Sequence, residues 1–144
     1  MSLMEDNMPK LRSAGLLTLM LLSLGSHLMA QARTRDLTQA EAHELVYQAL
    51  DTSARKLPKL AFDFYVKPNV PEFYMLAVTW DNPTGSVMVG HFAVNRVTGD
   101  VWRLVVCEKL ESVDLKHLQK TMRKRIGVST KELHKFERKA PCEP

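Results

Sequence analysis

The sequence lacks the short motifs that mark most enzyme and cofactor-binding families. It contains no HExxH or HxH pair, its two cysteines are not spaced as CxxC, and it has neither a glycine-rich phosphate loop nor GxSxG. The histidines beyond the N-terminal segment are far apart in the chain, at His43, His91, His117 and His134. We therefore predict no catalytic residue, no bound cofactor and no metal site.

The sequence also lacks an apolar run long enough to cross a bilayer, which needs roughly 20 residues. A shorter run from Leu16 to Leu24 follows Lys10 and Arg12, and Ala30-Gln31-Ala32 then supplies small residues at the −3 and −1 positions of a cleavage site. This order is typical of a secretory signal peptide, and a membrane anchor is the weaker alternative. We predict that residues 1–32 are removed and that the chain is exported, periplasmic or secreted, with no stable membrane span after processing.

Cysteine is scarce, with one residue at Cys107 and one at Cys142. An even number of cysteines in an exported chain predicts a disulfide, and two cysteines allow one intramolecular pairing. Closing a loop of this length restricts the unfolded chain by roughly 4 kcal/mol. The alternative is a small hydrolase or thiol enzyme that uses Cys107 with His91. A second cysteine in an oxidising compartment would usually capture the first, which disfavours this alternative.

Positive charge is in modest excess, with a net charge of +4, and it gathers near the C-terminus. From Asp114 onward there are nine Lys and Arg against four Asp and Glu. The segment 122–133 superficially resembles a DNA-binding helix-turn-helix, but an exported chain does not meet DNA, so we expect no nucleic-acid partner. Its basic face is either a solvated surface or a patch for an acidic partner, in which Lys116, Lys120 and Arg123 are candidate contacts.

Three helices are predicted from capping residues and apolar periodicity. Thr38 and Glu41 have the spacing of a capping box, and Ser129 and Glu132 repeat it. Gly127 suits the left-handed position that ends a helix. The expected helices run from about Gln39 to Arg55, from Ser112 or Asp114 to Ile126, and from Ser129 to near Pro141.

Between the first and second helices the apolar period changes to two, which predicts strands. The four expected strands cover residues 61–67, 73–80, 87–94 and 101–107. Short connections favour an antiparallel meander, because parallel neighbours need a longer crossover. We predict one α+β domain over residues 33–144, in the order α-β-β-β-β-α-α, with the helices packed on one face of the sheet. Aromatic side chains that emerge on the uncovered face would make a partner-binding surface.

The most regular stretch of the sequence is Phe92–Trp102, FAVNRVTGDVW. Gly99 suits a residue with positive φ, so the stretch predicts a tight turn between the third and fourth strands, with Arg96 and Asp100 exposed and available to a partner. Val94–Val101 resembles the hairpin of PepSY-type domains, which are small exported bacterial modules. The resemblance covers about residues 38–106. It implies a noncatalytic periplasmic or secreted binding module, and some relatives are thought to restrain proteases.

Taken together, these features predict a noncatalytic binding or inhibitory module that engages a protein partner in the cell envelope. An immunity protein or a lysozyme-type inhibitor is a narrower version of the same hypothesis. A small hydrolase or thiol enzyme that uses His91 and Cys107 is the alternative of a different class. The candidate partner contacts are Arg96, Asp100, Lys116, Lys120 and Arg123.

Overall fold

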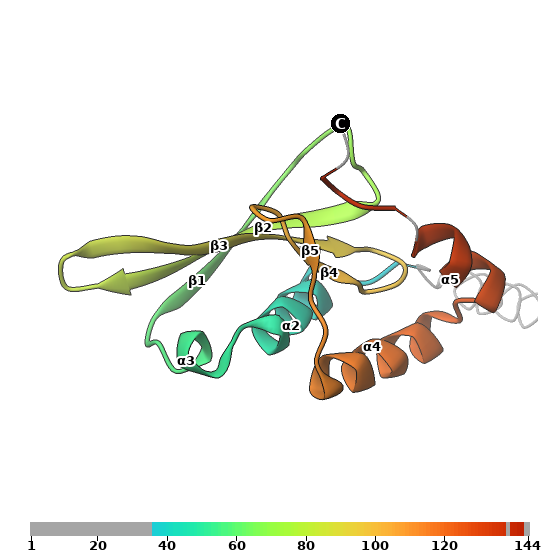
Figure 1. Ribbon diagram of the computed structural model, residues 1–144, viewed down its shortest axis with the longest axis horizontal. Helices are drawn as coiled ribbons and strands as arrows, with labels where there is room; N and C mark the ends of the chain where they lie inside the picture. The colour runs from blue at the N-terminus through green and yellow to red at the C-terminus, as the bar shows by residue number, and fades with distance from the viewer. Residues whose placement is uncertain (1–35, 138, 143–144) are drawn as a thin grey trace, which may run out of the picture. The chain divides into compact units, whose positions relative to one another are not determined.

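Five antiparallel strands, hydrogen-bonded in chain order, form the sheet of this protein (Figure 1). The computed structural model describes residues 36–137 and 139–142, all within one compact unit, so the predicted signal peptide, residues 1–32, lies outside the described part. The predicted antiparallel meander and the α+β class are confirmed. The strands are β1 (Leu60–Tyr65), β2 (Phe73–Asn82), β3 (Gly85–Asn95), β4 (Val101–Arg103) and β5 (Glu108–Lys109).

The prediction of four strands was wrong, because the expected strand 101–107 stops at Arg103 as β4, and a turn over 104–107 then leads to a fifth short strand, β5, at Glu108–Lys109. The backbone N–H of Leu104 still donates to the His91 carbonyl, at 2.9 Å, but the N–H of Cys107 turns back to the Leu104 carbonyl, at 3.3 Å. Cys107 has a positive φ of 47°, which a strand does not accommodate. The β-branched Val105 and Val106 suggested a strand but lie in the turn, exposed to solvent.

The hairpin of β2 and β3 is longer than predicted. Its strands continue to Asn82 and Gly85, and the Asn82 side-chain carbonyl accepts a hydrogen bond from the Thr84 N–H at 2.8 Å within the turn. A β-bulge between Val78 and Thr79 shifts the register partway along the hairpin. The outer part of the hairpin extends beyond the helices as an arm (Figure 1).

The first predicted helix is also divided. Leu50 is extended, with ψ 147°, and Asp51 then caps a new helix by accepting from the Ala54 N–H at 2.8 Å. A strong capping residue inside a helical pattern therefore started a second helix where one continuous helix was expected. The later predictions hold: Ser112 caps the next helix, and Gly127 ends it with φ 71°. The helices are α2 (Gln39–Ala49), α3 (Thr52–Arg55), α4 (Val113–Ile126) and α5 (Thr130–Phe136).

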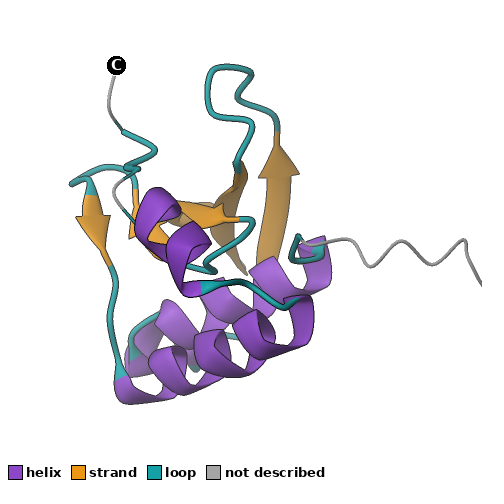
Figure 2. Cartoon of the chain, turned by 90° about the vertical axis from the view of Figure 1, so that its right-hand side faces the viewer, coloured by secondary structure: helices purple, strands orange, loops and turns teal. Residues whose placement is uncertain are grey.

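The main core lies between the sheet and the helices α2 and α4, which cover one face (Figure 2). Alternate strand residues such as Leu76, Val78 and Phe92 point to this side, and each is fully buried against Leu45 and its neighbours. Helix α5 contributes no buried residue. It lies beside the end of the hairpin around Val97 (Figure 1), so the prediction that both C-terminal helices pack on the sheet face needs correction.

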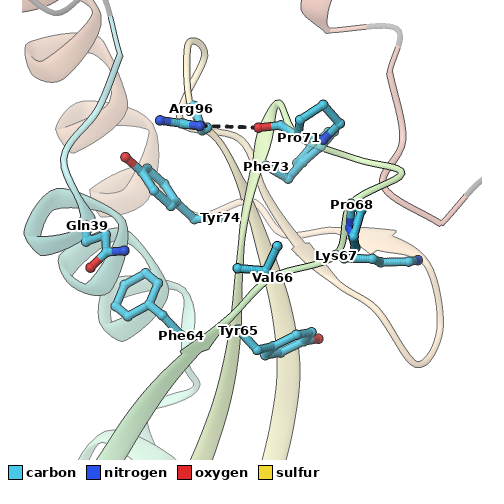
Figure 3. A pocket seen from close by; sticks show the side chains of 10 residues that line it. All are labelled: Gln39, Phe64, Tyr65, Val66, Lys67, Pro68, Pro71, Phe73, Tyr74 and Arg96. Carbon is cyan, nitrogen blue, oxygen red and sulfur yellow. Dashed lines mark hydrogen bonds between the residues drawn. The ribbon is translucent and has the colours of Figure 1, made fainter.

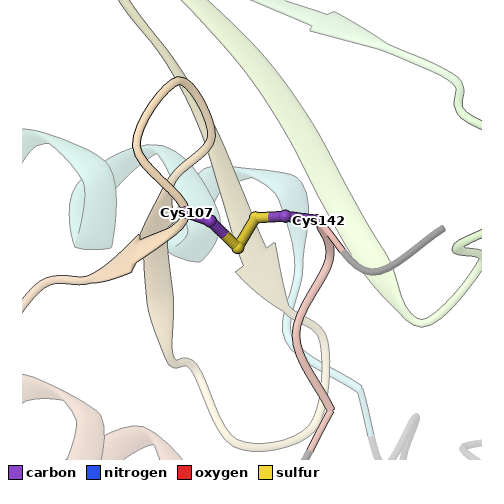
Figure 4. The surroundings of a disulfide bond; sticks show 2 residues. All are labelled: Cys107 and Cys142. Atoms are coloured by element: carbon purple, nitrogen blue, oxygen red, sulfur yellow. A yellow bond between two sulfur atoms is a disulfide. The ribbon is translucent and has the colours of Figure 1, made fainter.

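The opposite face of the sheet is only partly open. A second apolar cluster lies there, in which the segment between β1 and β2 contributes Val70. The chain beyond α5 returns to the same region, where Cys142 and Cys107 form a disulfide with their Cα atoms 5.8 Å apart (Figure 4). Lys139 of this tail also pairs with Glu72. The cluster consists of Val70, Phe73, Met75 and Ala93, with Trp102 and Leu104 against it.

Candidate functional site

The hairpin between β3 and β4 is the tight turn that the sequence predicted. The Asn95 side-chain carbonyl accepts hydrogen bonds from the N–H groups of Val97 and Thr98, at 2.9 and 3.0 Å. The Asn95 N–H donates to the Asp100 carbonyl at 2.9 Å, and Gly99 takes φ 72°. The side-chain carbonyl of Asn95 therefore holds the turn from within.

Asp100 is not exposed, contrary to the prediction. It is 3 % exposed, and one carboxylate oxygen lies 3.0 Å from both Arg123 Nη2 and Lys109 Nζ. The Thr98 hydroxyl donates to the other oxygen at 2.8 Å. Gln119 adds a hydrogen bond from its amide to the Gly99 carbonyl, at 2.9 Å. The charges of Asp100 and Arg123 therefore fasten the hairpin to α4.

The remaining candidate contacts lie in two different places. Lys116 and Lys120 are exposed on α4, where Lys116 pairs with Glu111. Arg96 lies instead beside the segment that links β1 to β2, where its side chain is 37 % exposed. The structure thus brings Asp100 and Arg123 together, and it keeps Arg96 apart from the basic face of α4.

A pocket of about 610 Å³ lies next to Arg96 (Figure 3). It opens because β1 ends at Tyr65, opposite Met75, while β2 begins two residues earlier at Phe73. The chain from 66 to 72 leaves the sheet at this point, so the start of β2 has no strand beside it on the β1 side. The sequence showed only a proline-containing link here and gave no sign of a cavity.

Aromatic side chains make the inner wall of the pocket, and Tyr74 is held on three sides. Its hydroxyl donates to the Leu37 carbonyl at 2.7 Å, and its ring meets that of Phe64 edge-on with centroids 6.0 Å apart. The Arg96 guanidinium carbon lies 4.8 Å above the ring. These contacts fix the wall before any ligand arrives.

Arg96 makes few of the hydrogen bonds that its guanidinium permits. Nη2 lies 3.3 Å from the Asp36 carboxylate, and Nη1 donates to the Pro71 carbonyl at 3.3 Å. Nε is buried and has no hydrogen-bond partner in the part of the chain that the structure describes. Lys67 also lines the pocket, and its amino group forms no ion pair with any described residue. Both cations keep unused donors.

The outer rim of the pocket is apolar and accessible. Val66 is 88 % exposed, and Tyr65 beside it is 39 % exposed. The Tyr65 ring meets His91 edge-on at 6.1 Å, and partial burial raises the pKa of its phenol. An apolar rim with a fixed aromatic wall suits contact with another molecule.

The residues proposed for the enzymatic alternative do not form a nucleophile and base. Cys107 is bonded to Cys142, so its sulfur is not a thiolate in this structure. Among the described residues, no three His, Cys, Asp or Glu side chains gather as metal ligands. None of the described helices has the length and apolar character needed to cross a membrane.

Neither a protein-family model nor a curated protein matches the chain, so the PepSY resemblance stays a prediction. A solved structure does match: a chain of a type VI secretion system effector-immunity complex from Pseudomonas protegens. The TM-score is 0.60 and the identity is 25 %, and the match covers 76 % of this chain and 92 % of the other. This chain therefore shares its fold with nearly the whole of a chain in a two-partner protein complex.

Proposed function

We propose that this chain is a protein-binding module whose task is to hold another protein. Within that class, we propose an immunity-type protein that binds a toxic effector and blocks it. The main observation in support of this proposal is the structural similarity to a chain of an effector-immunity complex, which extends over 92 % of that chain. A shared fold does not by itself define a function, so the local features of this chain must agree with it.

Two local features support the immunity role over the effector role. The pocket has a fixed aromatic wall and an apolar rim at Tyr65 and Val66, as expected of a binding surface. The only two cysteines are joined, which removes the thiol required by the enzymatic alternative. An effector that acts as an enzyme needs a reactive constellation, and an inhibitor needs a complementary surface.

We further propose that the protein acts in the cell envelope after export. The disulfide is compatible with an oxidising compartment, where such bonds form and persist. An immunity protein in that compartment would meet an effector that attacks envelope components. A lysozyme-type inhibitor would act in the same place, on a muramidase.

Co-expression tests this function. The protein encoded next to this chain's gene is directed to the periplasm of a sensitive host, with and without this chain. We expect the neighbour to reduce colony counts and this chain to restore them, with the two proteins forming a stable complex in isothermal titration. Absence of protection, although oxidised protein is present in the periplasm, would overturn the immunity role. Inhibition of a muramidase in vitro would identify the lysozyme-inhibitor version.

A further inference from the structure

We infer that the pocket beside β2 binds an acidic, apolar segment of the protein partner. In this arrangement the Arg96 guanidinium and the Lys67 amino group, which point to opposite sides of the pocket (Figure 3), each meet a partner carboxylate, and an apolar side chain packs against Phe64 and Tyr74. The identity of the partner as an effector rests on the proposed function. The chemistry of the pocket rests on its own residues.

The charge of the lining specifies an acidic occupant. Lys67 and Arg96 are the charged residues of the lining, and both are positive (Figure 3). Asp36 offsets part of the Arg96 charge from outside the lining, at 3.3 Å. The Nη hydrogens of Arg96 that are not bonded to Asp36 or Pro71, and the amino group of Lys67, can then each bond a carboxylate.

The size and shape of the pocket favour a chain segment. A volume of about 610 Å³ lies within the range of sites that hold a drug-sized ligand. The exposed rim at Tyr65 and Val66 continues the apolar surface outside the pocket, where neighbouring residues of a partner would lie. An isolated small ligand would leave that rim uncovered.

The sheet edge offers an extended segment a place to lie. Beyond the pair Tyr65–Met75, β2 continues through Tyr74 to Phe73 without a strand on the β1 side. The Phe73 N–H already donates to the Val70 carbonyl at 3.1 Å, so an extended partner segment would lie along this edge through its side chains, which alternate between the two faces, and not through a full ladder of backbone hydrogen bonds. A partner segment there would direct one side chain towards Tyr74 and the next towards the rim.

Selection from a random heptapeptide phage library tests the inference without knowledge of the effector. The mature protein, purified from the periplasm in oxidised form, is the target. We expect the selected peptides to be enriched in Asp or Glu next to Phe, Tyr, Leu or Ile. Peptides without an excess of acidic residues would overturn the inference.

Charge reversal then places the binding site. We expect Lys67→Glu to weaken binding of the selected peptides about tenfold, the effect of losing one charge-assisted contact. Lys56→Glu is the matched control, with an equal charge change at an exposed residue that follows α3 and does not line the pocket. We expect it to leave peptide affinity unchanged. Equal loss in both variants would indicate general electrostatic attraction and overturn the assignment to the pocket, as would no loss in Lys67→Glu. Unchanged urea midpoints show that both variants fold.

The two proposals fail in distinguishable ways. If the proposed function is wrong, the unaltered chain gives no protection in the co-expression experiment. If the inference about the pocket is wrong, the selected peptides lack an excess of acidic residues or bind Lys67→Glu as tightly as the wild type. These peptide experiments involve no effector. When both hold, Lys67→Glu weakens protection and Lys56→Glu does not.

Discussion

Two charged residues of the segment Asn95–Asp100 lie in different surroundings. Asp100 belongs to the hairpin between β3 and β4, and Arg96 lines the pocket beside β2. At the hairpin, Asp100 is 3 % exposed and bonded to Arg123, Lys109 and Thr98. At the pocket, the Arg96 side chain is 37 % exposed, and its Nη groups lie 3.3 Å from the Asp36 carboxylate and 3.3 Å from the Pro71 carbonyl.

This difference separates charges that the fold requires from charges that a ligand can use. A buried carboxylate with two cationic partners contributes to stability, and removing it leaves cations without compensation. A half-exposed cation with spare donors contributes little to stability but can contribute to binding. The regular stretch Phe92–Trp102 thus forms a structural hairpin, and the proposed binding pocket lies next to it.

Removing the disulfide should have the largest effect on stability. It should also affect the pocket and the hairpin between β3 and β4 to different degrees. Replacing Cys107 and Cys142 with serine opens the loop that the disulfide closes, whose ends are 35 residues apart in the sequence. We expect the free energy of unfolding to fall by about 4 kcal/mol. Urea denaturation measures the change. The oxidised wild type treated with a reducing agent serves as the control and should match the double variant.

The same variant should loosen the pocket more than the hairpin. Lys139, three residues before Cys142, pairs with Glu72 at the end of the segment 66–72. Without the disulfide this tether weakens, so we expect faster hydrogen exchange in 66–72 than in the hairpin 95–100, which α4 holds independently. Equal acceleration in both segments would contradict the separation between them.

Asp100→Asn should have the next largest effect. It leaves Arg123 and Lys109 without their carboxylate, and because their side chains are 23 % and 30 % exposed, we expect a loss of about 2 kcal/mol, below that of a fully buried pair. Asp63→Asn is the control, since Asp63 is exposed on β1 and should change stability by less than about 0.5 kcal/mol. Affinity for the pocket peptides should not change. Equal losses in the two variants would show that the Asp100 network does not stabilise the hairpin.

Gly99→Ala should have an effect of similar size, and Gly127→Ala provides its control. Both glycines have φ near +70°, where an added side chain costs about 1 kcal/mol. A methyl group at Gly99 would also lie 3.2 Å from Leu45 and 3.3 Å from Leu37, whereas Gly127 has open space. We expect a loss of about 2 kcal/mol at Gly99 and about 1 kcal/mol at Gly127. Thermal unfolding of the two variants checks the difference, and equal losses would mean that the hairpin is not packed against α2.

The sequence was most informative where a local interaction decides the structure. The capping boxes at Thr38 and Ser129, and the helix end at Gly127, depend on neighbours within four residues, and all three appear as expected. Local signals were misleading where tertiary contacts compete. Val105 and Val106 favour a strand, but they lie in the turn that brings Cys107 to the disulfide.

The candidate site was harder to predict, because it depends on where two segments part. The register of β1 against β2 determines that Tyr65 is the last paired residue, and no residue type in the sequence marks that end. The prediction included Arg96 for its expected exposure. It omitted Phe64, Tyr74 and Lys67, which become neighbours of Arg96 only in the folded chain.

Substitution at Tyr65 should have the smallest effect, and it tests whether the pocket behaves independently of the hairpin between β3 and β4. Partial burial at the pocket rim raises the pKa of its phenol above 10.0. A raised folded-state pKa favours folding below the unfolded pKa, and this contribution is lost as the pH rises through the folded value. Subtracting the absorbance titration of Tyr65→Phe from that of the wild type isolates the Tyr65 phenol. We expect this phenol to ionise above pH 10, and the small contribution to stability is lost over the same pH range. Binding of an acidic peptide should raise that pKa further, because it adds burial and negative charge. Asp100→Asn, at the hairpin, should leave the Tyr65 titration unchanged, and a shift there would show that the two regions are coupled.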